Sequence, residues 1–311
     1  MNALATLTEA LDAALPGAVT RNAPTAPLTT YRCGGSLAVL VKIGTEDALR
    51  RFAEVLGGND VPVLVVGRGS NLLVADAGFP GVGIVLQDDF EQLNVDRRAL
   101  SVHAGGAVPL PVLARRVGAA GISGLEFFVG IPGSVGGAVR MNAGGHGRET
   151  KDVLGGARVC SLDTGEVREL GPGDLELGYR RSSLTNRDVV VAATFAGAEG
   201  DPAESAARID EIVRWRREHQ PGGQNAGSVF TNPPGDAAGR LIEACGLKGL
   251  RVGGVVVSEK HANFFVAEDG ATAGDVVALI QEVQRRVGAE TGIQLSPELH
   301  MVGFDTEESS S

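Results

Sequence analysis

The 311-residue chain is poor in the residues that build disulfide frameworks and metal sites. Its three cysteines, Cys33, Cys160 and Cys245, are far apart and show no paired spacing, which indicates free thiols in a reducing compartment. The five histidines include no pair four residues apart that could share a metal ion on one helix face. The sequence therefore predicts no disulfide and no metal site.

Basic residues are also in deficit, because 28 Lys and Arg face 38 Asp and Glu, for a net charge of −10. Neutralising nucleic-acid phosphates needs a basic surface, so this balance excludes nucleic acid as a main partner. No basic segment followed by an apolar core opens the chain, and no apolar run reaches membrane-spanning length. We expect a cytoplasmic globular protein without a membrane partner, whose 43% hydrophobic content suffices for two or three domain cores.

Glycine, by contrast, is abundant, and its densest segment runs from Gly124 to Gly145, with seven glycines and a proline in 22 residues. Glycine lets backbone N–H groups approach a ligand without an intervening Cβ, and such amide-rich loops bind anions, above all where a helix begins. A shorter segment, 65–74, has the same character, since an apolar strand breaks there into Gly67 and Gly69. The two loops predict one extended dinucleotide that is bound at two points.

Two common nucleotide-binding motifs are excluded. The loop at 67–72 begins like G-x-G-x-x-G, but Leu72 replaces the third glycine and no acidic residue follows at the expected strand end, so we reject a Rossmann fold. The P-loop pattern G-x-x-x-x-G-K-[ST] does not occur. An alternative interpretation is that these glycines serve only tight turns. The presence of two similar loops, each after an apolar strand, weakens this alternative.

Apolar periodicity and capping residues predict a mixed α+β chain. Asp201 as a helix cap and Pro202 at the first helical position mark a boundary after the two loops. The expected helices lie over 4–15, 46–56, 110–118, 202–217, 238–245 and 272–288, and the expected strands over 37–43, 63–66, 83–86, 100–104, 157–161, 189–195, 253–257 and 293–302. The predicted parts are an N-terminal helix and lead-in (1–28), a larger domain (29–198) with lobes at 29–87 and 88–198, a smaller domain (199–303) and a disordered tail (304–311).

Nine segments in order resemble one family, the UDP-N-acetylenolpyruvoylglucosamine reductases, flavoenzymes of peptidoglycan precursor synthesis and so of cell-wall biogenesis. They are 29–35, 66–73, 130–138 with 141–144, 179–182, 226–233, 238–243, 246–249, 260–264 and 292–298. The resemblance implies a two-lobed FAD-binding domain of the vanillyl-alcohol-oxidase type followed by a smaller α+β substrate-binding domain. The shorter subtype matches better, because neither Tyr31 nor Tyr179 lies in an extra segment that could close over the UDP.

The resemblance also implies FAD as cofactor, bound non-covalently because no histidine or cysteine lies in a flavin-attachment context. Loop 66–71 and the loop that begins near 130 would hold its pyrophosphate. The residues that the resemblance assigns to FAD are Arg32, Gly34, Gly35, Gly67, Arg68, Gly69, Ser70, Asn71, Ile131, Ser134, Gly136 and Gly137.

By resemblance, NADPH reduces FAD, and hydride then passes to C3 of the enolpyruvyl ether of a UDP-sugar, which leaves negative charge at C2. Arg180 and Glu298 would bind that charge, and Ser228 would protonate C2. The planar guanidinium fork of Arg180 suits a carboxylate. In the expected strand 293–302, the apolar residues share one face, so Glu298 lies on the opposite face, outside the core.

The implied substrate contacts are Tyr179, Asn232, Lys260, His261 and Asn263, and the implied state is a monomer. Thr231 stands where relatives commonly have lysine, so a charged contact is missing or supplied elsewhere. Two alternatives stay open. One is a flavin oxidase or dehydrogenase of the same superfamily with another substrate, and the other is a catalytically silent flavin or nucleotide-sugar sensor. Substrate-dependent NADPH oxidation would separate the sensor from an enzyme.

Overall fold

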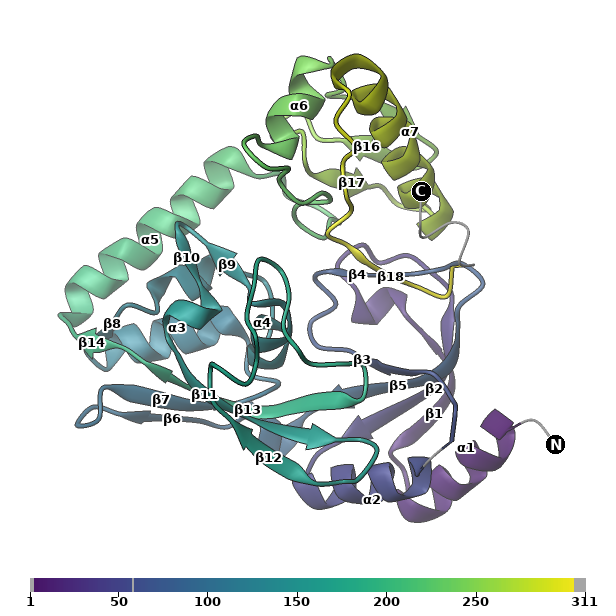
Figure 1. Ribbon diagram of the computed structural model, residues 1–311, viewed down its shortest axis with the longest axis vertical. Coiled ribbons are helices and arrows are strands. Elements are labelled where there is room, and N and C mark those ends of the chain that lie inside the picture. The colour runs from purple at the N-terminus through teal and green to yellow at the C-terminus, as the bar shows by residue number, and fades with distance from the viewer. Residues whose placement is uncertain (1–2, 58, 305–311) are drawn as a thin grey trace. The chain divides into compact units, whose positions relative to one another are not determined.

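The computed structural model describes residues 3–57 and 59–304, and its mixture of helices and strands confirms the predicted α+β class (Figure 1). The helices are α1 (Ala3–Ala14), α2 (Glu46–Leu56), α3 (Leu110–Ala119), α4 (Val135–Met141), α5 (Pro202–His219), α6 (Ala238–Ala244) and α7 (Ala273–Thr291). The strands are β1 (Val19–Pro24), β2 (Ser36–Ile43), β3 (Val63–Val65), β4 (Leu72–Val74), β5 (Phe79–Leu86), β6 (Leu93–Asp96), β7 (Ser101–Gly105), β8 (Ile122–Ser123), β9 (Gly144–Gly145), β10 (Arg148–Glu149), β11 (Leu154–Ser161), β12 (Val167–Leu170), β13 (Asp188–Ala196), β14 (Ala198–Glu199), β15 (Arg251–Val252), β16 (Val255–Val257), β17 (Phe265–Ala267) and β18 (His300–Val302).

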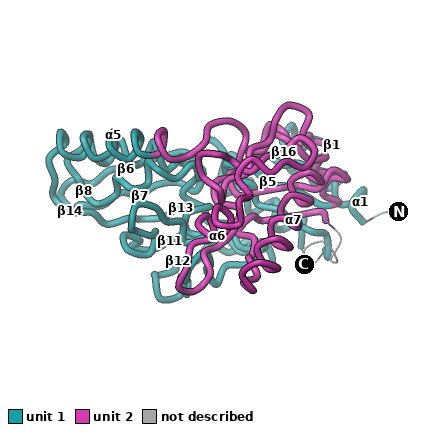
Figure 2. The backbone as a smooth tube through the Cα atoms, turned by 90° about the horizontal axis from the view of Figure 1, so that it is seen from above, with its two compact units in different colours: residues 1–21, 39–68, 81–215 teal, residues 22–38, 69–80, 216–311 magenta. Residues whose placement is uncertain are grey.

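The chain forms two compact units that are interleaved in sequence (Figure 2). The first unit comprises residues 1–21, 39–68 and 81–215, and the second comprises 22–38, 69–80 and 216–311. Two short early segments therefore pack with the C-terminal part of the chain. The domain boundaries proposed from the sequence stay predictions.

The first unit is built around the antiparallel sheet β12-β11-β13-β7-β6. On the central strand β13, Val190, Ala193 and Phe195 enter a core that also holds α3 and α4. Val189 and Val191 enter a second core with α1 and α2. A strand that is buried on both faces has no polar face, which explains the unbroken apolar run of β13.

The second core of the first unit confirms the helical periodicity predicted near the N-terminus. Leu7 and Leu11 of α1 pack with Leu49 and Phe52 of α2 in that core. Thr45 caps α2 as predicted, because its side chain accepts a hydrogen bond from Ala48 N at 3.1 Å. The same core contains residues of β2, β3 and β5, where β3 and β5 pair in parallel.

The second unit contains the antiparallel sheet β15-β16-β17, which α7 contacts on one side (Figure 1). Helix α7 begins at a capping box in which Thr272 and Asp275 bind each other's backbone N–H groups. Its buried face packs in one core with α6 and with Tyr31 and Leu73 from the early segments. These early segments are therefore part of the second unit's core.

The predicted strand 293–302 is wrong in extent, because only His300–Val302 forms the strand β18. Pro297 within the segment has no backbone N–H to donate, which interrupts a regular ladder. The predicted alternation of burial is nevertheless present, since Leu295 and Leu299 are buried in the core. Phe304 also packs against this core, and residues 305–311 of the predicted disordered tail lie outside the described residues.

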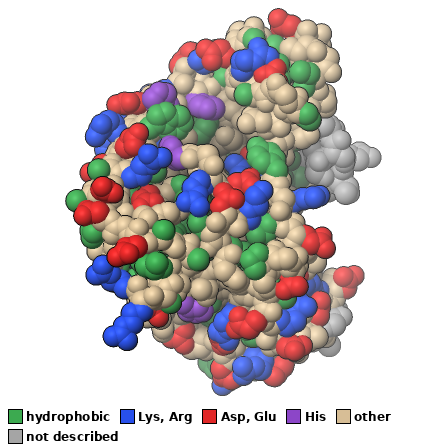
Figure 3. All heavy atoms as spheres, turned by 60° about the vertical axis from the view of Figure 1, so that its left-hand side comes forward, with side chains coloured by type: hydrophobic (Ala, Val, Ile, Leu, Met, Phe, Trp, Pro, Cys, Tyr) green, Lys and Arg blue, Asp and Glu red, His purple; other side chains and the backbone are tan. Residues whose placement is uncertain are grey.

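Among the described residues, no helix is long and apolar enough to cross a membrane. On the face shown in Figure 3, acidic and basic side chains are interspersed.

Candidate active site

The two glycine-rich loops meet in the first unit at Gly67 and Ser134. A Cβ on Gly67 would lie 2.7 Å from Ser134 Oγ, so a side chain there would displace the serine hydroxyl. Ser134 is the N-cap of α4, and its hydroxyl accepts a hydrogen bond from Gly137 N at 3.4 Å. Gly137 is exposed, and a Cβ there would meet only Ser134 Oγ, at 3.6 Å. The start of α4 therefore presents a surface without side chains beside loop 66–68, while the N–H groups of Val135, Gly136 and Gly137 are bound to Val108 O, Gly106 O and Ser134 Oγ.

Gly136 has a different role from its neighbour. Its N–H donates to Gly106 O at 2.8 Å, and a Cβ would lie 3.1 Å from the same oxygen. Its φ is not in the left-handed region, so it needs no unusual backbone conformation. Gly136 therefore packs α4 closely against the strands and does not offer a free amide. Ile131, also predicted in this wall, is half-buried and donates its N–H to Phe128 O.

The second unit holds the remaining residues of the predicted cofactor loop. Gly69 is buried with φ +59°, and a Cβ there would lie 1.9 Å from Leu28 O. Gly34 and Gly35 approach 74–76 equally closely, since Cβ atoms on them would lie 2.3 Å from backbone oxygens. Next to Gly69, the hydroxyl of Thr29 is buried and has no hydrogen-bond partner among the described residues. An orphaned buried hydroxyl beside a side-chain-free loop fits a polar ligand such as a phosphate group.

The exposed arginines of these loops extend from both segments. Arg32 lies in the second unit with φ +55°, and Arg68 lies in the first unit. Ser70 and Asn71 are half-buried in the second unit, where the Asn71 carboxamide donates to Glu298 O at 3.0 Å. Asn71, a predicted cofactor residue, therefore binds the main chain of Glu298, a predicted catalytic residue.

Arg180 lies at the tip of a tight turn in the first unit. Gly178 N donates to Arg181 O at 3.1 Å, and Arg181 N donates to Gly178 O at 3.3 Å. Arg180 has φ +56°, which non-glycine residues rarely adopt, and its guanidinium lies 5.1 Å from the ring centre of exposed Tyr179. A strained residue that its surroundings hold in place is a candidate for function.

Asn142 fixes this turn and was not among the predicted site residues. It is fully buried at the end of α4 with φ +41°, and its amide donates to Gly178 O at 2.9 Å. Its side-chain oxygen accepts from Lys151 N at 2.9 Å. Ser182 adds a bond from its hydroxyl to Arg140 O at 2.7 Å. The preference of Asn for left-handed C-caps was a usable signal.

In the second unit, the segments that carry Ser228 and Glu298 are hydrogen-bonded through Val229. Glu298 N donates to Val229 O at 2.7 Å, and Val229 N donates to Asn263 O at 2.9 Å. Ser228 forms an isolated β-bridge with Phe264. Both Ser228 and Glu298 are half-buried, which agrees with the predicted place of Glu298 outside the core. The structure thus brings together the predicted proton donor and one predicted charge-binding residue.

Two predicted substrate contacts have side chains that bind the protein itself. Asn263 is 3% exposed, and its carboxamide accepts from Phe230 N at 2.9 Å and donates to Phe230 O at 2.8 Å. Asn232 accepts from Ala238 N at the start of α6. The side chain of Asn263 therefore binds the main chain of the segment that carries Ser228. Its polar atoms are occupied by the protein and are not presented to a substrate.

The other predicted contacts lie near the same segment. Lys260 Nζ donates to Arg217 O at 2.7 Å. His261 packs edge-on against Phe264, with ring centres 4.7 Å apart, and its Nδ1 accepts from Asn263 N. Burial lowers the pKa of His261 below its ordinary value. Thr231, at the position of the common lysine, donates its hydroxyl to Ser296 O at 3.2 Å.

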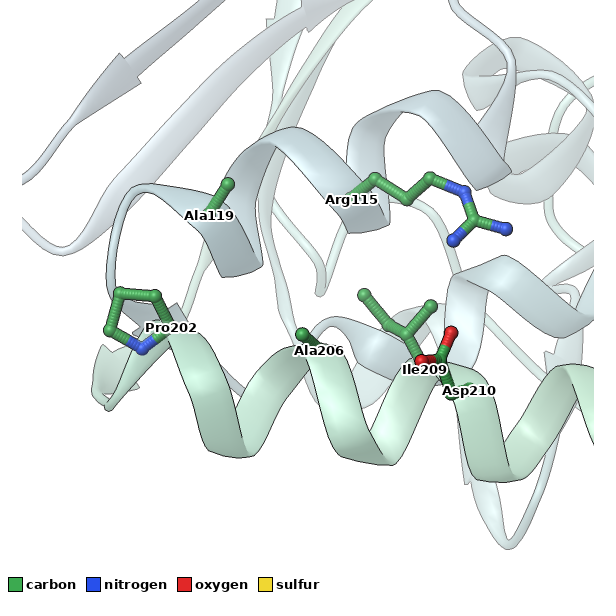
Figure 4. Close-up of a pocket in the computed structure, with 6 residues that line it drawn as sticks. All are labelled: Arg115, Ala119, Pro202, Ala206, Ile209 and Asp210. Atoms are coloured by element: carbon green, nitrogen blue, oxygen red, sulfur yellow. The ribbon is translucent and has the colours of Figure 1, made fainter.

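A hollow with a volume of about 250 Å³ lies between α3 and α5 in the first unit (Figure 4). It is lined by Arg115, Ala119, Pro202, Ala206, Ile209 and Asp210. None of these residues belongs to the predicted site. Within residues 3–57 and 59–304, no group of three or more His, Cys, Asp or Glu side chains could hold a metal ion.

Comparison with known proteins gives consistent matches. Residues 219–302 match the family model of the UDP-N-acetylenolpyruvoylglucosamine reductase C-terminal domain, and residues 37–171 match an FAD binding domain. The UDP-N-acetylenolpyruvoylglucosamine reductases of Paramagnetospirillum magneticum and Rubrobacter xylanophilus are 43% and 42% identical to the chain. The matches cover 93% of both chains in the first case, and 88% of this chain and 92% of the relative in the second. A crystal structure of the Thermus caldophilus UDP-N-acetylenolpyruvylglucosamine reductase has a TM-score of 0.79 and 36% identity, over 91% of this chain and 98% of that one.

Proposed function

This chain belongs to the UDP-N-acetylenolpyruvoylglucosamine reductase family, and on that basis we propose that it reduces UDP-N-acetyl-3-O-(1-carboxyvinyl)-glucosamine to UDP-N-acetylmuramate with NADPH. It is an FAD-containing oxidoreductase of peptidoglycan synthesis. The finer steps, in which hydride reaches C3 and a proton reaches C2, are assigned to residues by the family resemblance, and the local geometry of each unit supports the assignment.

The residues present fit FAD. In the first unit, the side-chain-free surface at Gly137 and Gly67 leaves room for the cofactor. In the second unit, the close backbone approach at Gly69 and the orphaned Thr29 hydroxyl suit a phosphate group. Arg68 and Arg32 are exposed and would add positive charge. The chemistry that bound FAD supplies is hydride transfer, first from NADPH and then to C3 of the enolpyruvyl ether.

Arg180 would bind the substrate carboxylate. Charge that appears at C2 is shared with this carboxylate, so a guanidinium there stabilises the transition state more than the ground state. The tight turn and Asn142 hold the Arg180 main chain in a conformation that an unconstrained arginine would leave. This preorganisation lowers the cost of placing the fork when the substrate arrives.

Ser228 would deliver the proton to C2. Its O–H bond breaks, a C–H bond forms at C2, and the serine oxygen regains a proton from water. Serine is a weak acid, so the step needs a strongly basic carbanion in a site without bulk water. Glu298, whose segment is hydrogen-bonded to that of Ser228, would in its protonated form donate a hydrogen bond to the carboxylate over which this charge spreads.

One observation carries the proposal: the segments of Ser228 and Glu298, 70 positions apart in the chain, are joined by the 2.7 Å bond from Glu298 N to the carbonyl oxygen of Val229, the residue after Ser228. A catalytically silent flavin or sugar-nucleotide sensor has no need to bring these two segments together. Assignment of substrate contact to Tyr179, Lys260 and His261, a monomeric state and a cytoplasmic location remain proposals from the family.

The test is an absorbance spectrum of the purified protein, followed by NADPH oxidation with and without the enolpyruvyl sugar nucleotide. We expect a flavin spectrum, release of FAD on denaturation and NADPH oxidation that depends on the nucleotide. A colourless protein that binds no added FAD would overturn the cofactor assignment. Flavin reduction without reoxidation by the nucleotide would indicate another flavin oxidoreductase of the superfamily.

A further inference from the structure

Asn71 makes contacts that a residue serving only a cofactor loop would not need. Its Nδ2 donates to Glu298 O at 3.0 Å, and its own carbonyl oxygen accepts from His300 N at 3.0 Å. The two bonds hold the residues on either side of Leu299, which is 5% exposed and anchored in the core. One residue of the 69–74 segment thus fixes the main chain at 298 and 300.

The side chain of Asn71 extends a backbone ladder. Strands β4 and β18 pair in parallel, with His300 opposite Leu72 as the first register pair. Before that pair, the Glu298 carbonyl receives its hydrogen bond from the Asn71 carboxamide. A carboxamide at this position substitutes for the missing strand partner, because an unpaired backbone carbonyl would carry a desolvation cost.

The other side of the Glu298 residue is held as well. Its N–H donates to Val229 O at 2.7 Å, so both polar backbone groups of Glu298 are bound. Val229 follows Ser228, and Asn71 lies two residues after Gly69, where the backbone leaves no room for a side chain. A continuous hydrogen-bonded path in the second unit therefore joins the predicted cofactor loop to the predicted proton donor.

We infer that Asn71 is a positioning residue that fixes Glu298, through the bond from its carboxamide to the Glu298 carbonyl, for the substrate-reducing half of the reaction. The inference rests on the proposed function, because it assumes that Glu298 acts on charge at C2. It gives the Asn71 side chain a task that is separate from holding FAD.

The test compares Asn71→Ala and Asn71→Asp with the wild-type holoenzyme. Aspartate keeps the size of asparagine, but its carboxylate cannot donate a hydrogen bond to Glu298 O. Alanine removes the same bond without introducing a charge. If the aspartate variant does not fold, the alanine variant still tests the inference. The matched control is Asn59→Ala, which removes a carboxamide bond to Leu56 O of 3.1 Å in the first unit. Stopped-flow absorbance follows flavin reduction by NADPH and reoxidation by the enolpyruvyl sugar nucleotide separately.

We expect flavin content and reduction to stay within about twofold of wild type, and reoxidation to slow by about 10²-fold, as misplacement of a reacting group by about 1 Å does. In the Glu298→Gln background, Asn71→Ala should add little further loss, because the effect passes through Glu298. In the flavin-free protein, hydrogen–deuterium exchange over 295–302 should accelerate in Asn71→Ala and not in Asn59→Ala.

Three results would overturn the inference. Loss of FAD, or equal slowing of both half-reactions, would make Asn71 a cofactor-loop residue only. Unchanged reoxidation would show that the bond is dispensable. Full additivity with Glu298→Gln would show that Asn71 acts elsewhere. Failure of the proposed function is distinguishable from all three, because wild-type flavin would then not be reoxidised by the nucleotide.

Discussion

At the scale of single residues, buried asparagines hold the candidate reacting groups by binding main-chain atoms. Asn142 binds the turn that carries Arg180, and Asn263 binds both polar backbone groups of Phe230, two residues after Ser228. A carboxamide can donate and accept at once, so it replaces a missing strand neighbour where the chain is irregular. Substituting these asparagines should therefore displace the candidate reacting groups without removing any of them.

Ser228→Ala should leave flavin reduction by NADPH nearly intact and slow reoxidation by the enolpyruvyl substrate by about 10²- to 10⁴-fold, the range for a general acid. The first half-reaction requires no proton at C2, whereas the second cannot finish without one. Stopped-flow traces of the two half-reactions measure this. Ser183→Ala, which removes an exposed hydroxyl bonded to Asp174 O, is the control. Equal slowing of both half-reactions by Ser228→Ala would contradict the role.

His261 should make stability depend on pH. Burial, the largest cause, lowers its folded pKa, with a smaller lowering by Lys248 and an opposing effect of Glu243. The unfolded chain, with a histidine pKa of about 6.5, then binds more protons than the folded one in the window just below that value. The free energy of unfolding should fall as pH decreases through this window.

Urea unfolding at several pH values between 7 and 5 measures that slope. His261→Gln should flatten it, and His103→Gln, at an exposed position in β7, is the matched control. The same slope in His261→Gln and in the wild type would assign the pH dependence to other groups.

At the scale of elements, α4 connects two parts of the candidate site within the first unit. Its first turn lies beside Gly67, and its last residue is followed by Asn142, which binds the Arg180 turn. Gly136 and Gly137 occupy neighbouring positions in the first turn but face different surroundings. Gly136 packs against Gly106 O, whereas Gly137 is exposed and a Cβ there would make only an ordinary contact with Ser134 Oγ.

Gly136→Val should lower both FAD affinity and the thermal stability of the flavin-free protein, because a Cβ would lie 3.1 Å from Gly106 O. Gly137→Val should lower FAD affinity alone, since a Cβ there makes only an ordinary 3.6 Å contact. Flavin fluorescence titration and melting of the flavin-free proteins provide the two readings. Unchanged FAD affinity in Gly137→Val would show that this face of α4 does not border the cofactor.

Local signals in the sequence predicted the elements that local interactions stabilise. The cap at Thr45 and the apolar stripe of α2 are confirmed, and Asp201 accepts from Ala203 N at the start of α5 as its position predicted. The parallel pairing of 300–302 with 72–74 was not predictable, because partners so far apart leave no mark on local periodicity. For the same reason, the sequence did not predict the carboxamide contacts of Asn142 and Asn71, although both residues lie in segments that carry the family resemblance, 141–144 and 66–73.

The error over 293–302 has a specific cause. Alternating burial requires only that successive side chains point to opposite sides, and an extended segment achieves this without a ladder. Here 296–298 contacts 229–231 through single bonds on either side of Pro297. The catalytic roles follow from the sequence only through the resemblance, because Arg180 and Ser228 carry no individual signal and the alternation that places Glu298 outside the core does not distinguish a cleft from open solvent.

At the scale of the whole molecule, the second unit draws on three separate stretches of chain. Tyr31, Cys33 and Leu73 from the early stretches are buried in the same core as Val276 and Ile280 of α7. The C-terminal stretch alone would expose the surfaces that these residues cover, and β18 would lose its partner β4.

A fragment of residues 216–311 should therefore lack cooperative unfolding in urea, measured by far-UV circular dichroism, and should give poorly dispersed amide NMR spectra. A second fragment, in which residues 22–38 and 69–80 are joined to it by Gly/Ser linkers, should regain both properties. A cooperative transition in the short fragment would show that the early segments are not needed for its core.

The interleaved second unit also imposes an order on biosynthesis. The 69–80 segment leaves the ribosome about 220 residues before β18, which at 5–20 residues per second means a wait of roughly 11 to 44 s. Until α6 and α7 have emerged, Leu73 and Tyr31 lack most of the core that they enter, whereas the central sheet of the first unit is formed by contiguous chain over 93–196. We expect the nascent chain to carry β4 without its strand partner until β18 emerges, and therefore to bind chaperones that recognise exposed apolar segments.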